Sequence, residues 1–182
     1  MPMLAYLVPI ISVILIHGAG HALAAACAGV RFDRLRVTAT GFRLLTPSGF
    51  PSYRAEALTA IGGPLFNIVS ALIVAHACPS SELFVPLSLY LGALNLLPIR
   101  GFDGASILTC LLCSHHPPIP SCLPHVAERV IGALSVLTLF AFWMISIYLL
   151  LRRGSALSLY VFCLQLFRTI FVEQHDAKRA DS

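Results

Sequence analysis

The chain has 182 residues, of which 58% are hydrophobic and only 11% charged, and its mean hydropathy is +0.86. A soluble domain of this length cannot bury so much apolar surface, so the composition excludes an ordinary soluble protein and indicates a lipid bilayer as the surroundings. The net charge of +4 implies no nucleic-acid partner, because the arginines flank apolar segments and are better explained as topology signals.

The first apolar segment covers residues 4–29 and is long enough to span a bilayer. It lacks the basic start of a secretory signal and exceeds the usual apolar length of one, so we expect it to remain in the mature protein. Residues 31–54 form an arginine-rich loop, which the positive-inside rule places in the cytoplasm. Within it, residues 30–45 alternate apolar and polar side chains and turn at Gly41, which predicts a short β-hairpin at the membrane face.

A second span is predicted over residues 56–78 and a third over residues 84–113. The third is interrupted at Pro98, Gly101 and Gly104, which should break the helix at membrane depth. Non-helical backbone is tolerated there only against protein or a water-filled cavity. Two further spans are predicted over residues 126–151 and 156–172, followed by a polar tail over residues 173–182.

Together these segments predict an all-α integral membrane protein with four to five transmembrane helices and one short β-hairpin. We expect a single membrane-embedded domain over residues 1–172, in which a core of about residues 4–113 precedes the two extra helices. The six cysteines lie mostly in apolar segments, where cysteine behaves as a small hydrophobic residue, so no disulfide framework is expected.

His17 and His21 lie four residues apart in the first span, so on a helix both project from one face and can reach one metal ion. Asp103 is the only acidic residue of the third segment. Two imidazoles and a carboxylate match a catalytic zinc site with an open fourth position. Two alternatives need no metal: the histidines could bond to neighbouring carbonyl groups, and Asp103 could pair with Arg100.

Three motifs occur in the order and approximate spacing of the three core helices of the site-2 protease family of intramembrane zinc metallopeptidases, which residues 11–112 resemble. They are HGAGH at residues 17–21, GGPLFN at residues 62–67 and NLLPIRGFDG at residues 95–104. The family pattern is His-Glu-x-x-His, then Gly-Pro-x-x-Asn, then Asn-x-x-Pro leading to Asp-Gly. The hairpin between the first two core helices and the lack of a PDZ insertion resemble the small branch that processes sporulation factors.

This resemblance implies a three-helix metallopeptidase core that holds one zinc ion through His17, His21 and Asp103. It implies cleavage of a membrane protein or membrane-adjacent peptide, in a multi-pass protein of a bacterial cell membrane whose active-site side faces the cytoplasm. It also implies that Asn67 and Asn95 line the cleft or hold the substrate backbone. Hydrogen bonds between helices would explain these two amides equally well.

Gly18 stands where the family has its glutamate, the general base that takes a proton from water and later returns one to the leaving amine. Loss of a general base costs about 10²- to 10⁴-fold in rate, so we expect an impaired metallopeptidase. Neither Glu56, at the start of the second span, nor Asp103 offers an obvious replacement. The alternative is a catalytically inactive pseudoprotease that binds and regulates a membrane partner.

Two other kinds of metal site are compatible with parts of the sequence. A haem or metal-transport protein would explain the histidine pair but not the other two motifs. Cys110, Cys113, Cys122 and His125 could hold a second zinc ion. The first two of these lie at an apolar helix end and the loop that follows is rich in proline, so a single zinc ion remains the expectation.

Overall fold

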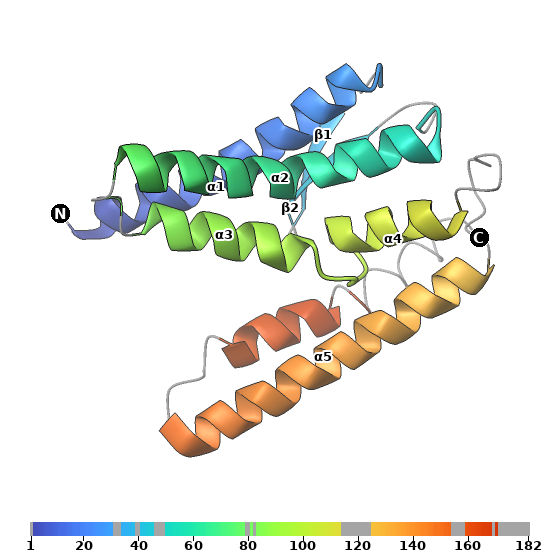
Figure 1. Cartoon of the computed structure of the whole chain (residues 1–182). Coiled ribbons are helices and arrows are strands. Elements are labelled where there is room, and N and C mark those ends of the chain that lie inside the picture. The colour runs from blue at the N-terminus through green and yellow to red at the C-terminus, as the bar shows by residue number, and fades with distance from the viewer. Residues whose placement is uncertain are drawn as a thin grey trace.

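The structure, a computed structural model, describes residues 2–30, 34–38, 41–45, 50–78, 81, 83–113, 125–153, 159–168 and 170. In chain order its elements are α1 (Pro2–Cys27), β1 (Arg34–Thr38), β2 (Gly41–Leu45), α2 (Tyr53–Ala77), α3 (Phe84–Asn95), α4 (Asp103–Cys113) and α5 (His125–Arg153). An apolar helix over Leu159–Arg168 follows and is named the C-terminal helix below. Helices α3 and α4 lie end to end, with α1 and α2 on one side and α5 with the C-terminal helix on the other (Figure 1).

Three helical segments are long and apolar enough to cross a bilayer, namely Tyr6–Cys27, Tyr53–Ala77 and Val126–Arg152. Large apolar side chains on these helices are exposed, as for Leu72 at 64%, which suits a lipid-facing surface. The predicted span over residues 84–113 is divided into α3 and α4, of 12 and 11 residues, each too short to cross alone. The described part thus has three full-length spans where the sequence predicts four to five.

Strands β1 and β2 form an antiparallel pair in which Arg34 lies opposite Leu45 and Thr38 opposite Gly41. Gly41, where the sequence predicts the turn, begins β2, and residues 39–40 between the two strands lie outside the described residues. The hairpin as a whole therefore remains a prediction. The helices alone carry the candidate site described below.

Helices α1 and α2 touch through their backbones at two glycines. A Cβ atom on Gly62 would lie 2.5 Å from the carbonyl oxygen of Gly20 and 2.6 Å from the Cβ of Ala24, which is closer than packed atoms approach. Small residues allow membrane helices to approach each other in this way. Because the two helix axes are so close, side chains on the facing sides of α1 and α2 reach the backbone and side chains of the other helix.

The break between α3 and α4 depends on two glycines. Gly101 has a φ of 90°, a left-handed conformation that favours glycine. A Cβ atom on Gly104 would lie 2.5 Å from the carbonyl oxygen of Leu97, so the turn can close over the start of α4 only without a side chain there. The helix break predicted from the sequence is confirmed, and it delivers Asp103 as the first residue of α4.

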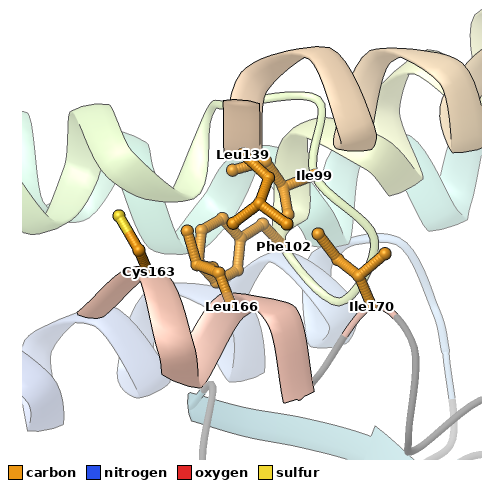
Figure 2. Close-up of a cluster of buried hydrophobic side chains, with 6 residues drawn as sticks. All are labelled: Ile99, Phe102, Leu139, Cys163, Leu166 and Ile170. Carbon is orange, nitrogen blue, oxygen red and sulfur yellow. The ribbon is translucent and has the colours of Figure 1, made fainter. Parts of the chain in front are cut away.

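The same turn packs against the C-terminal half of the chain. Figure 2 shows a buried cluster in which side chains of the turn, of α5 and of the C-terminal segment meet: Ile99, Phe102, Leu139, Cys163, Leu166 and Ile170. The side chains of Ile99 and Cys163 have no exposed surface. The segment that leads to Asp103 is therefore covered by α5 and the C-terminal segment on the side that faces away from α2.

Candidate metal centre

The two histidines lie on the face of α1 that packs against α2. Both are buried, with 6% of each residue exposed, and their rings meet edge to face at an interplanar angle of 88°. The Nε2 atoms of His17 and His21 lie 3.1 Å apart. Both imidazoles therefore point to one place, as their four-residue spacing on a helix predicts.

Asp103 reaches that point from the other side. Its Oδ2 atom lies 3.3 Å from Nε2 of His17 and 3.3 Å from Nε2 of His21. Among the described residues, these three form the group whose ligand atoms lie close enough together to hold a metal ion. The structure thus brings together the three residues that the sequence proposes as ligands, across more than 80 positions of the chain.

The geometry of the three atoms fits a zinc ion. Zinc bonds of about 2.0–2.1 Å at tetrahedral angles place ligand atoms about 3.3 Å apart, and the three separations here are 3.1, 3.3 and 3.3 Å. The Oδ2 atom of Asp103 is buried and has no hydrogen-bond partner among the described residues. A carboxylate oxygen in this position is costly without a cation, so both the spacing and the charge suit a bound metal.

Gly63 of α2 forms the floor of the site. A Cβ atom there would lie 2.8 Å from Cε1 of His17 and 2.7 Å from Cε1 of His21, and it would also touch Nε2 of His21. The second glycine of the GGPLFN motif therefore makes room for the imidazoles. The sequence placed Gly63 in a family motif but did not predict its contact with the imidazoles.

The backbone of α2 orients His21. Its Nδ1 atom lies 2.7 Å from the carbonyl oxygen of Thr59. Because a carbonyl oxygen only accepts, Nδ1 must carry the hydrogen and donate it, which leaves the Nε2 lone pair directed at the site. Sequence reasoning missed Thr59, and no residue pattern could have found it, since every residue has a carbonyl group.

Asn67 orients His17 in a comparable way. Its side chain has no exposed surface, and its Nδ2 atom lies 3.3 Å from Nδ1 of His17, while its Oδ1 atom has no partner among the described residues. An amide fits equally well when rotated by half a turn. In that orientation Oδ1 accepts a hydrogen bond from Nδ1, and Nε2 of His17 is free to bind a metal.

The other amide and the competing cation form hydrogen bonds with other partners. Asn95 donates through Nδ2 to the carbonyl oxygen of Leu91, at 2.9 Å, within α3. Arg100 donates through Nη2 to the carbonyl oxygen of Glu128 on α5, at 2.8 Å. The guanidinium group is thus directed toward α5, whereas the carboxylate of Asp103 is directed toward the histidines, so the alternative of an Asp103–Arg100 pair loses its support.

Gly18 lies in α1 directly after the first histidine, partly buried and with no side chain to accept a proton. Glu56 does not replace the missing base, because it precedes Gly63 by seven residues, about 10 Å along the helix axis. A general base must act within about 3 Å or through one water molecule.

The other predicted metal sites gain no support. A haem iron needs its two histidines on opposite faces of the porphyrin, which two Nε2 atoms 3.1 Å apart on one helix cannot provide. Of the four residues of the possible second zinc site, Cys110 and Cys113 are buried in α4. Cys122 and the side chain of His125 lie outside the described residues.

No family model and no curated protein matches this sequence. The fold does match a solved structure, a site-2 protease from Methanocaldococcus jannaschii, with a TM-score of 0.67. The match covers 91% of this chain and 76% of that protein, at 17% sequence identity. The chain therefore shares the site-2 protease fold, as the three sequence motifs predicted, and it is a membrane protein.

Proposed function

We propose that this protein is an intramembrane zinc metallopeptidase-like protein whose peptide hydrolysis is impaired by the glycine at position 18. The observation that carries the proposal is the convergence of three ligand atoms at 3.1–3.3 Å in a buried site. The shared fold supports the same conclusion. We further propose that the site belongs to one domain over residues 1–172, that it holds a single zinc ion, and that its substrate is a membrane-embedded or membrane-adjacent peptide.

The chain's own residues would bind the ion and orient the side chains that hold it. His17, His21 and Asp103 would hold the ion, Thr59 and Asn67 would orient the two imidazoles, and Gly63 would leave space for them. Zinc bound there would supply Lewis-acid activation of a peptide carbonyl group and of the attacking water. A helical substrate would have to unwind to present that carbonyl.

Among the described residues, no further side chain has been found beside the metal ligands that could accept the proton. In the family that the motifs resemble, a glutamate at the position of Gly18 fills this role. Gly18 has no positive φ and lies within α1, so glutamate can occupy the position without backbone strain. A restored base is therefore expected to raise the cleavage rate by about 10²- to 10⁴-fold.

The test combines metal analysis with activity. Zinc content is measured on the detergent-purified wild-type protein and on the variants Gly18→Glu and Gly18→Gln, and each is then given a panel of membrane-anchored peptides. Glutamine matches glutamate in size but takes up no proton, so it controls for the added side chain. We expect about one zinc ion in all three proteins and rapid cleavage only with Gly18→Glu.

Two results would overturn the proposal. Absence of zinc from the wild type, with no cleavage by any form, would leave a binding protein on a protease scaffold. Wild-type cleavage as fast as that of Gly18→Glu would show that another group serves as the base, and that the protein is not impaired.

A second candidate function is favoured by Gly18 itself, because the three candidate ligands converge while glycine stands where the base is expected. In this alternative the protein is a pseudoprotease that binds and regulates a membrane partner. It predicts that the wild type binds a membrane-anchored peptide without cutting it. Fluorescence anisotropy of labelled peptides in detergent would measure this binding, and Gly18→Glu would then bind but remain inactive.

A further inference from the structure

The turn over residues 96–102 sets the position of the third candidate ligand. Asp103 follows it directly and begins α4. Two backbone hydrogen bonds lie within the turn, one from Ile99 N to the carbonyl oxygen of Leu97 at 2.8 Å and one from Phe102 N to that of Ile99 at 3.0 Å, and others join its ends to α3 and α4. A short turn with these few internal bonds has little rigidity of its own, so its outside contacts determine where the carboxylate lies.

One face of α5 holds the middle of this turn through polar contacts. The backbone N–H of Arg100 donates to Oγ of Ser135 at 3.0 Å, and Nη2 of Arg100 donates to the carbonyl oxygen of Glu128 at 2.8 Å. Gly132 lies between these two positions, and a Cβ atom on it would lie 2.8 Å from Nη2. Residues 128, 132 and 135 follow helical spacing, so a single stripe of α5 receives both ends of Arg100.

Apolar contacts hold the turn on either side of Arg100. Ile99 and Phe102 pack against Leu139, one turn further along the same face of α5, and against the C-terminal helix (Figure 2). The side chain of Ile99 has no exposed surface and that of Phe102 has 8%. The turn is therefore bound to α5 by hydrogen bonds at its centre and by buried side chains at its flanks.

We propose that α5 acts as a latch for the metal centre, and that Arg100, Gly132 and Ser135 are positioning residues that hold Asp103 at ligand distance from the histidines. The inference rests on the proposed metal binding. Metal–ligand distances tolerate deviations of only about 0.2 Å, and a ligand next to an unlatched turn would move by more. The C-terminal half of the chain lies outside the helices that carry the three motifs. It thereby contributes to the geometry of the site.

The test measures zinc affinity in detergent by competition with a chromophoric chelator. Ser135→Ala removes the hydroxyl group that Arg100 N–H bonds to, and we expect about 10-fold weaker zinc binding, at the lower end of what loss of an outer contact costs a metal site. Ser146→Ala is the matched control, because Ser146 is equally buried on the same helix but lies about three turns from Ser135. It should bind zinc as the wild type does.

Gly132→Ala separates positioning from general stability. The added methyl group displaces the guanidinium of Arg100 from Glu128, while alanine is the better helix former within α5. We expect zinc affinity to fall several-fold while the melting temperature of the metal-free protein stays constant or rises. A residue with only a structural role would change both quantities in the same direction.

Coupling also runs in the reverse direction, so zinc should tighten the latch. Cys163 is a native reporter, since its side chain is fully buried in the cluster that encloses the turn. Modification by N-ethylmaleimide, followed peptide by peptide with mass spectrometry, should be slower with zinc than with a chelator. The exposed Cys27 should react at the same rate in both conditions, and Ser135→Ala should abolish the difference at Cys163.

The possible outcomes separate the latch from the proposed function. If the wild type binds no zinc, the proposed function fails and the latch fails with it. If the wild type binds zinc but Ser135→Ala and Gly132→Ala bind it equally well, the latch alone is wrong. A loss of affinity that follows melting temperature in all variants, Ser146→Ala included, would also overturn the latch.

Discussion

Replacement of Gly63 by alanine should abolish tight zinc binding while the protein remains folded. The new Cβ atom would lie 2.7 Å from Cε1 of His21 and 2.8 Å from Cε1 of His17, whereas carbon atoms in contact stay about 3.5 Å apart or more. Each ring must therefore withdraw by about 0.7 Å. Because zinc ligation tolerates about 0.2 Å, at least one imidazole is lost from the ligand set.

The expected loss is about 100-fold in zinc affinity, or roughly 2.7 kcal/mol. Chelator competition in detergent gives the affinity, and thermal unfolding monitors the fold. Alanine favours a helix over glycine by up to about 1 kcal/mol, so a lower affinity would not reflect a weaker α2. Gly92→Ala provides the control, because its Cβ would meet the carbonyl oxygen of Pro64 at 3.2 Å and the Cβ of Asn67 at 3.4 Å, the latter an ordinary contact distance, while neither imidazole is among its nearest contacts.

One result would refute this reasoning. If Gly63→Ala binds zinc within about threefold of the wild type, the imidazoles cannot lie against the α2 backbone as described. The convergence of His17, His21 and Asp103 would then need another explanation. Equal losses in Gly63→Ala and Gly92→Ala would point instead to a general opening of the helix bundle.

Three further predictions concern the same centre. Asn67→Leu removes the partner of His17 Nδ1 and should weaken zinc binding by about 10- to 100-fold. Asn95→Leu should leave zinc affinity unchanged, and equal effects of the two variants in chelator competition would contradict the role of Asn67 in orienting His17. Zinc at 1,000 times its dissociation constant should stabilise the folded protein by about 4.1 kcal/mol, and this thermal shift should be absent from His17→Ala; a wild-type melting temperature that ignores zinc would exclude the site. Gly104→Ala places a methyl group against backbone carbonyl groups of the turn and should cost about 1–3 kcal/mol of stability, together with zinc binding; an unchanged unfolding curve would show that the turn can open.

The break in the third apolar segment shows what local sequence can predict and what it cannot. Pro98, Gly101 and Gly104 predicted a break because each restricts or frees the backbone at its own position. How far the helices on either side extend depends on packing. The segment over residues 84–113 forms two short helices, α3 and α4, and the turn between them packs against α5 and the C-terminal helix.

The sequence by itself determined the membrane environment, the face shared by His17 and His21, and the presence of one carboxylate in a broken helix. Each of these follows from composition or from helical spacing, which are local properties. Only the tertiary structure decided that Asp103 meets the histidines, that Asn67 contacts His17, and that Arg100 is directed to α5 rather than to Asp103. Such contacts join residues 28 to 86 positions apart, and they depend on how α1, α2, α4 and α5 pack, which no short motif encodes.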